Sequence, residues 1–156
     1  MTLSVRKISA IAAISVLVLS GCGAKSVTNP TVSGEAGSKP VIGAPQGAAP
    51  TTLVTNDIIV GTGKEAVASS TLTVHYTLMA WSTGQVVESS WDGGSPATFP
   101  LSGVIAGWQQ GIPGMKEGGR RLLVIPPDLG YGATGAGASI GPNETLVFVV
   151  DLIKVS

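Results

Sequence analysis

Apolar and polar residues alternate most clearly along residues 71–78. Leu72, Val74, Tyr76 and Leu78 alternate there with three threonines and His75. A period of two is typical of a β-strand with one buried face, so the pattern predicts a strand with Tyr76 on the buried side and His75 on the other. Further strands are predicted over residues 86–89, 97–99, 120–125 and 145–155.

One short helix is predicted over residues 104–111. Ile105 and Trp108 are spaced to share a face of this helix, with Val104 beside them. Pro113-Gly114 ends it. Strands combined with a single short helix predict an antiparallel α+β domain, in which the helix covers one face of the sheet.

Two of the predicted strands are apolar on both faces. Leu122 and Val124 alternate with other aliphatic residues, and so do Val147 and Val149. An antiparallel sheet with one face in water should be polar on that face. We therefore expect this outer apolar stripe to be covered by the N-terminal segment, by a second copy of the chain or by a partner.

The N-terminal residues have the pattern of a bacterial export signal. Arg6 and Lys7 precede an apolar run over residues 8–19, which is short for a membrane span. Leu19-Ser20-Gly21-Cys22 then matches the processing site of bacterial lipoproteins. We predict a lipoprotein signal peptide over residues 1–22 and lipidation of Cys22, which would anchor the chain to the bacterial membrane outside the cytoplasm. An ordinary signal peptide or a short membrane anchor are the alternatives.

Residues 23–50 consist mainly of Gly, Ala, Ser, Thr and Pro, without an apolar period. Such a segment buries too little surface to offset its ordering entropy, so it is predicted to be a disordered tether. As a random coil it would span roughly 30 Å. The folded domain is expected over residues 51–156.

Charge and composition exclude several kinds of partner. The 156 residues carry 9 basic and 9 acidic side chains, whereas a nucleic-acid partner needs a basic face for its phosphates. His75 and Cys22 are the single histidine and cysteine, so the chain lacks the usual ligand set of a zinc site. We predict no nucleic-acid partner, no metal and no cofactor.

A series of apolar and aromatic segments follows the predicted elements. Its members are Val74-His75-Tyr76-Thr77, Phe99-Pro100-Leu101, Val104-Ile105-Ala106-Gly107-Trp108, Tyr131-Gly132-Ala133-Thr134-Gly135 and Leu146-Val147-Phe148. In order and spacing the series resembles the FKBP-type peptidyl-prolyl cis-trans isomerases, the family that binds rapamycin, from about Thr51 to Ser156. The resemblance implies an FKBP-like half-wrapped antiparallel β-sheet around one short α-helix, with a pocket between them.

The resemblance also implies roles for individual residues. The indole of Trp108 would form the floor under a substrate proline ring, and the backbone N–H of Ile105 and the hydroxyl of Tyr131 would bind substrate carbonyls. The implied catalytic residues are Tyr76, Glu88, Ile105 and Tyr131, and the implied substrate-binding residues are Tyr76, Val87, Phe99, Val104, Ile105, Trp108, Tyr131, Ile140 and Phe148.

Several positions depart from the family pattern. Val87 and Ala97 stand where aromatic residues are usual, Leu129 stands at a common Tyr, and Glu88 replaces the usual Asp. The loss of two aromatic walls should widen the pocket and admit water. We therefore expect catalysis and macrolide affinity to be reduced.

Together with the predicted lipid anchor, the resemblance implies a membrane-tethered, extracytoplasmic peptidyl-prolyl cis-trans isomerase that assists the folding of exported proteins. It would act on their X-Pro segments, with a rapamycin-type macrolide as a further ligand. The alternative is a proline-peptide-binding chaperone or interaction module on the same fold, with weak or no turnover.

Overall fold

The computed structural model describes residues 28–156. The predicted signal peptide and Cys22 lie outside these residues, as do residues 23–27. Within residues 28–156, no helix has the length and apolar character needed to cross a membrane.

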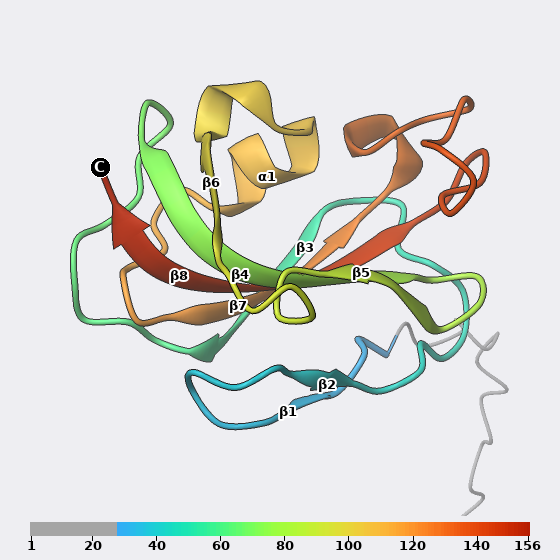
Figure 1. Cartoon of the computed structure of the whole chain (residues 1–156). Helices are drawn as coiled ribbons and strands as arrows, with labels where there is room; N and C mark the ends of the chain where they lie inside the picture. Colours follow the sequence, from blue (N-terminus) through green and yellow to red (C-terminus); the bar gives the residue numbers. More distant parts are fainter. Residues whose placement is uncertain (1–27) are drawn as a thin grey trace, which may run out of the picture.

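A six-stranded antiparallel sheet forms the body of the molecule (Figure 1). Five strands lie in the order β3-β7-β8-β4-β5, and β6 also pairs with β4. The bounds are β3 Val54–Ile59, β4 Thr71–Ala80, β5 Gln85–Ser89, β6 Ala97–Pro100, β7 Arg120–Ile125 and β8 Leu146–Val155, with a helix α1 at Ala106–Gly111 and 3₁₀ turns η1 at Leu101–Gly103 and η2 at Pro127–Leu129. The predicted antiparallel α+β class is confirmed for the described residues.

The helix α1 packs on one face of the sheet, which we call the front face (Figure 1). It begins at Ala106, two residues later than predicted, because Ile105 is still extended with φ −56° and ψ 152°. Gly107 allows the close approach of α1 to β7, since a side chain at this position would overlap Ile125. Trp108 follows on the same helix and is directed into the front core.

The two faces of the sheet carry two separate cores, as the alternation in β7 and β8 predicts. The front core includes Leu123 and Phe148 and packs against Trp108. The second core, on the back face, is formed by the residues of the predicted outer stripe together with others, and its buried members are Ile42, Met79, Leu122, Val124, Val147 and Val149.

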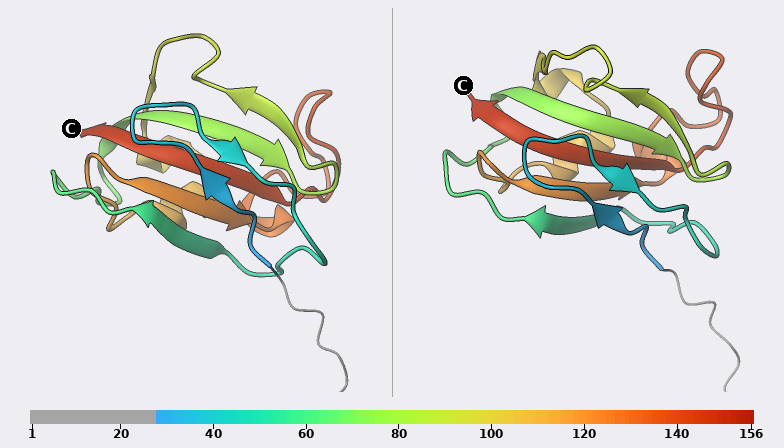
Figure 2. Two further views of the ribbon diagram at one scale, coloured as in Figure 1. Left: turned by 90° about the horizontal axis from the view of Figure 1, so that it is seen from below. Right: turned by 60° about the horizontal axis from the view of Figure 1, so that its bottom comes forward.

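The cover of the back face comes from residues 28–46, which we call the N-terminal arm. Its strands β1, Val32–Ser33, and β2, Val41–Ile42, form a two-stranded antiparallel sheet that lies across the main sheet opposite α1 (Figure 2). Ile42 is 8% exposed and packs into the back core. Of the three covers considered from the sequence, the structure therefore shows the N-terminal segment.

The prediction of a disordered tether is wrong for the arm. The error has a physical cause: the arm has too few apolar residues to fold alone, but the back face offers apolar surface on which Val32 and Ile42 pack. Polar contacts add to this, because the buried side chain of Arg120 donates hydrogen bonds to the carbonyls of Gly34, at 3.0 Å, and Ser38, at 2.6 Å. Burial supplied by a distant segment cannot be read from local periodicity.

Candidate functional site

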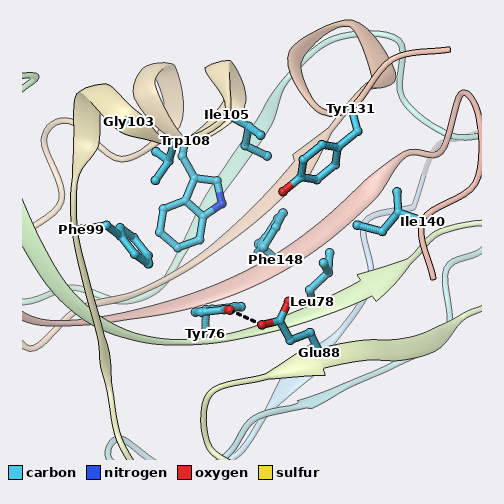
Figure 3. A pocket seen from close by; sticks show the side chains of 11 residues that line it. Tyr76, Leu78, Glu88, Phe99, Gly103, Ile105, Trp108, Tyr131, Ile140 and Phe148 are labelled. Atoms are coloured by element: carbon cyan, nitrogen blue, oxygen red, sulfur yellow. Dashed lines mark hydrogen bonds between the residues drawn. The ribbon is translucent and has the colours of Figure 1, made fainter. Parts of the chain in front are cut away.

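A pocket of about 340 Å³ opens on the front face between the sheet, α1 and the loop that follows η2 (Figure 3). Strands β4, β5, β6 and β8 provide one part of its wall, and the rest comes from α1, from residues 103–105 just before it and from the loop that follows η2. Its lining residues are Tyr76, Leu78, Glu88, Phe99, Gly103, Val104, Ile105, Trp108, Tyr131, Ile140 and Phe148.

The indole of Trp108 lies at the centre of an aromatic cluster in this pocket. Its ring meets those of Tyr76, Phe99 and Phe148 edge to face, with centroid distances of 5.9, 5.4 and 5.3 Å. Edge-to-face pairs are favourable arrangements for aromatic rings and hold each other in place. Trp108 is 3% exposed, and it lines the pocket, so the indole forms a floor without being sealed from the cavity.

Tyr76 and Glu88 form a polar pair at the pocket wall (Figure 3). The Tyr76 hydroxyl donates a hydrogen bond of 2.6 Å to Glu88 Oε1. Burial of the phenol raises the pKa of Tyr76 well above its ordinary value, and the hydrogen bond and negative charge of Glu88 raise it further. The phenol therefore stays protonated near neutral pH, and its proton points to the carboxylate.

Ile105 precedes the first residue of α1. Its carbonyl accepts hydrogen bonds from the amides of Trp108, at 3.0 Å, and Gln109, at 3.2 Å. The first amides of a helix have no partner within the helix, so the N–H of Ile105 belongs to the group available for external acceptors. The Gln109 side chain donates to the carbonyl of Val104 at 2.7 Å, which ties this loop to the helix.

Tyr131 and Ile140 come from the loop between η2 and β8. Tyr131 is 40% exposed, and its hydroxyl is directed towards the pocket (Figure 3). Ile140, which is 8% exposed, exchanges backbone hydrogen bonds with Ala136. Gly135 has φ +70° and lies against the carbonyls of Ile140 and Gly141, so this tight turn has no room for a side chain. The loop is thus held by its own backbone contacts.

The structure brings together all the site residues implied by the resemblance except Val87. Val87 is half-buried and packs against the front core without lining the pocket. The implied substrate contact of Val87 stays a prediction. Sequence reasoning missed Leu78 and Gly103. Leu78 follows Tyr76 by two residues on the same strand, so the alternation could have revealed it.

The residues described contain no group of three His, Cys, Asp or Glu side chains that could hold a metal. His75 lies on the back face, where its ring stacks on Trp91 with centroids 3.9 Å apart. Chemically, the pocket offers an apolar surface for a small ring, with a few hydrogen-bonding groups at its rim. This combination favours binding and desolvation of an uncharged group.

Comparisons with known proteins identify the family. A family model described as FKBP-type peptidyl-prolyl cis-trans isomerase matches residues 63–153. The chain belongs to this family. The predicted enzyme class, peptidyl-prolyl cis-trans isomerase, is confirmed by this membership.

Individual relatives agree with the family model. A probable FK506-binding protein of Corynebacterium glutamicum is 53% identical over 116 residues, which cover 74% of this chain and 98% of the relative. An FK506-binding protein of Streptomyces anulatus is 48% identical over 120 residues, covering 75% and 97%. Both matches reach back beyond β3 into the arm. The crystal structure of FkpA from Escherichia coli superposes with a TM-score of 0.64 at 40% identity, covering 68% of this chain and 49% of that one. The predicted FKBP-like fold is thereby confirmed.

Proposed function

We propose that the front pocket binds X-Pro segments of polypeptides and catalyses rotation about the prolyl peptide bond. Rotation must break amide resonance, with a barrier of about 18–20 kcal/mol, and takes tens to hundreds of seconds without a catalyst. The twisted amide is less polar than the planar one, so water favours the planar ground state. An apolar pocket lowers the barrier by removing that water and holding the twisted form.

The observation that carries this proposal is the indole of Trp108, held edge to face by three aromatic rings at the floor of an open pocket. In the proposed complex the proline ring lies on this indole. The N–H of Ile105 and the hydroxyl of Tyr131 bind the flanking carbonyls. Glu88 accepts a hydrogen bond from the Tyr76 hydroxyl, which holds the phenol in one orientation with its oxygen facing the substrate.

We further propose that the enzyme is a lipoprotein anchored through Cys22 and acts on exported polypeptides outside the cytoplasm. The support is the sequence of residues 1–22 alone. Metabolic labelling with a fatty acid, compared between the wild type and Cys22→Ser, tests this anchor. Label retained by Cys22→Ser would contradict it.

The second candidate function is a proline-peptide-binding chaperone that uses the same pocket. It is favoured by one observation: neither Val87 nor Ala97 contributes an aromatic wall to the lining. Fewer walls hold the twisted amide less firmly, while peptide binding needs only the floor and the rim.

Proline-limited refolding of a test protein distinguishes the two functions. We expect the full chain to accelerate refolding, Tyr131→Phe to reduce the acceleration, Trp108→Leu to abolish it, and a rapamycin-type macrolide to inhibit it. Suppressed aggregation without any acceleration would support the chaperone and contradict catalysis. Circular dichroism of each variant checks that it remains folded.

A further inference from the structure

Glu88 lies on β5, the last strand in the order of the sheet. Such a strand pairs with a neighbour on one side only, so contacts from outside the sheet help to hold it. In the order β3-β7-β8-β4-β5, strand β5 is last and pairs with β4. The register of that pairing shifts between Leu78 and Met79, opposite the segment that contains Glu88. Such an irregularity disrupts the ladder locally. The position of the carboxylate therefore depends on what holds the two ends of β5.

The N-terminal arm contacts both ends of this strand. Before β5, Ala44 and Pro45 lie against Gly84, 3.4 and 3.5 Å from where a side chain on Gly84 would begin. After β5, the Lys39 ammonium contacts the Asp92 carboxylate at 2.5 Å. The arm thus reaches from the turn that precedes β5 to the turn that follows it.

The turn after β5 is in turn bonded to the backbone of Tyr76. Ser90 Oγ accepts a hydrogen bond of 2.9 Å from the Tyr76 N–H, and the Ser90 N–H donates to the Tyr76 carbonyl at 3.1 Å. Ser90 Oγ also lies 2.9 Å from His75 Nδ1, and His75 stacks on Trp91. A displacement of this turn would therefore reach the residue whose phenol lines the pocket.

The arm is itself fixed to the back of the sheet by two independent sets of contacts. Ile42 packs among the aliphatic residues of the back core. Arg120, which is fully buried, bonds two carbonyls of the arm and the Asp151 carboxylate, the latter at 2.7 Å. A rigidly attached segment can transmit its position to β5, whereas a loose one could not.

We propose that the N-terminal arm is a positioning element for the Tyr76–Glu88 pair, acting by clamping both ends of β5 from the face opposite the pocket. The proposal rests on the proposed isomerase function. No arm residue lines the front pocket, so the arm acts through β5 and through the turn at Ser90. The arm is then part of the catalytic domain, although its sequence resembles a linker.

Two adjacent arm positions provide a matched test. Ile42 is 8% exposed and Val41 is 66% exposed, so Ile42→Asp places a charge in the back core and releases the arm, whereas Val41→Asp places the same charge in water. Both are made in the full chain, alone and combined with Glu88→Gln. The readouts are hydrogen exchange of the β5 amides and kcat/KM for a proline peptide.

We expect Ile42→Asp to speed exchange of the β5 amides and to lower kcat/KM by about 3- to 10-fold, the lower part of the range that coupling between contacting residues gives. Glu88→Gln should then cost a smaller factor in the Ile42→Asp background than in the wild type, because the carboxylate is already misplaced. Val41→Asp should change none of these quantities. A reduced effect of Glu88→Gln is not expected from a general loss of stability.

The proposal is overturned if Ile42→Asp frees the arm amides to exchange while β5 exchange, kcat/KM and the cost of Glu88→Gln stay as in the wild type. If Ile42→Asp does not fold, Ile42→Ala replaces it, with the exposed Val41→Ala as its control. Ile42→Ala should give the same changes in smaller degree, and faster exchange of the arm amides with no change in β5 exchange would equally overturn the proposal. A wild-type protein without isomerase activity would instead contradict the proposed function, whereas exchange of the β5 amides would still test whether the arm holds β5 in place.

Discussion

Arg120 offers a quantitative test of how the arm is held. Its side chain is fully buried, and its guanidinium donates hydrogen bonds to the Asp151 carboxylate and to the carbonyls of Gly34 and Ser38. Arg120 bonds Asp151 Oδ1, and Asp151 Oδ2 has no hydrogen-bond partner among the described residues. Substitution Arg120→Met would therefore leave a buried carboxylate without its counter-charge. Breaking a buried ion pair in this way costs about 3–5 kcal/mol, a large part of the 5–15 kcal/mol that typically stabilises a domain.

Urea denaturation followed by linear extrapolation measures this loss as the change in the free energy of unfolding. The neighbouring Arg121→Met is the matched control, because its partner Asp57 is 42% exposed and can regain hydration. We expect less than half the loss in the control. The double variant Arg120→Met/Asp151→Leu should recover much of the stability, since it removes both charges. A loss below about 1 kcal/mol for Arg120→Met, or a double variant no more stable than the single one, would refute this reasoning.

Three further predictions concern the pocket and the pH dependence. Tyr131→Phe should lower kcat/KM by about 2- to 12-fold with unchanged unfolding free energy, because it removes one substrate hydrogen bond worth roughly 0.5–1.5 kcal/mol; an unchanged kcat/KM would exclude this contact. Val87→Phe should extend an aromatic wall towards the pocket and raise macrolide affinity, measured by calorimetry. Weaker binding would contradict the expectation that missing aromatic walls lower this affinity. Burial raises the pKa of Asp151 above its ordinary value of 3.8 and outweighs the lowering by Arg120 and His75. A carboxyl whose pKa is higher in the folded than in the unfolded state stabilises the fold at pH values below its unfolded pKa, and this stability is lost as the pH rises through its folded pKa. The free energy of unfolding of the wild type, relative to that of Asp151→Asn, should therefore fall as the pH increases from 3 to neutrality. An increase of this difference with pH, measured by urea denaturation, would contradict the direction.

The elements that line the front pocket can be predicted largely from residue patterns in the sequence. The alternation over residues 71–78 correctly assigns Tyr76 to the pocket side and His75 to the back face, because a strand has a period of two whatever surrounds it. The helix that carries Trp108 was also predicted, although its first turn was placed two residues early. The double-sided apolar pattern of β7 indicated that the back face had to be covered.

The remaining features depend on contacts between distant segments. The arm has weak local signals, and its order comes from Arg120 and the back core, neither of which can be paired with it from spacing alone. Strand β3 was missed because its sequence, VTNDII, has a polar centre and is typical of a strand at the side of a sheet, where one neighbour supplies the register. The direction of the Val87 side chain depends on the irregular pairing of β5 with β4, which spacing along the sequence does not reveal.

We propose above that the pocket floored by Trp108 accelerates rotation about a prolyl bond by replacing water with apolar walls. Exchange NMR on a short X-Pro peptide in the presence of a small amount of the full chain measures that rotation directly. We expect cis–trans exchange, which takes tens to hundreds of seconds unaided, to become faster than about one per second. It should return to the unaided rate when a stoichiometric rapamycin-type macrolide fills the pocket. A peptide that binds at the pocket, seen as chemical-shift changes at Trp108 and Tyr131, but whose prolyl bond exchanges no faster than in buffer would contradict catalysis by this pocket.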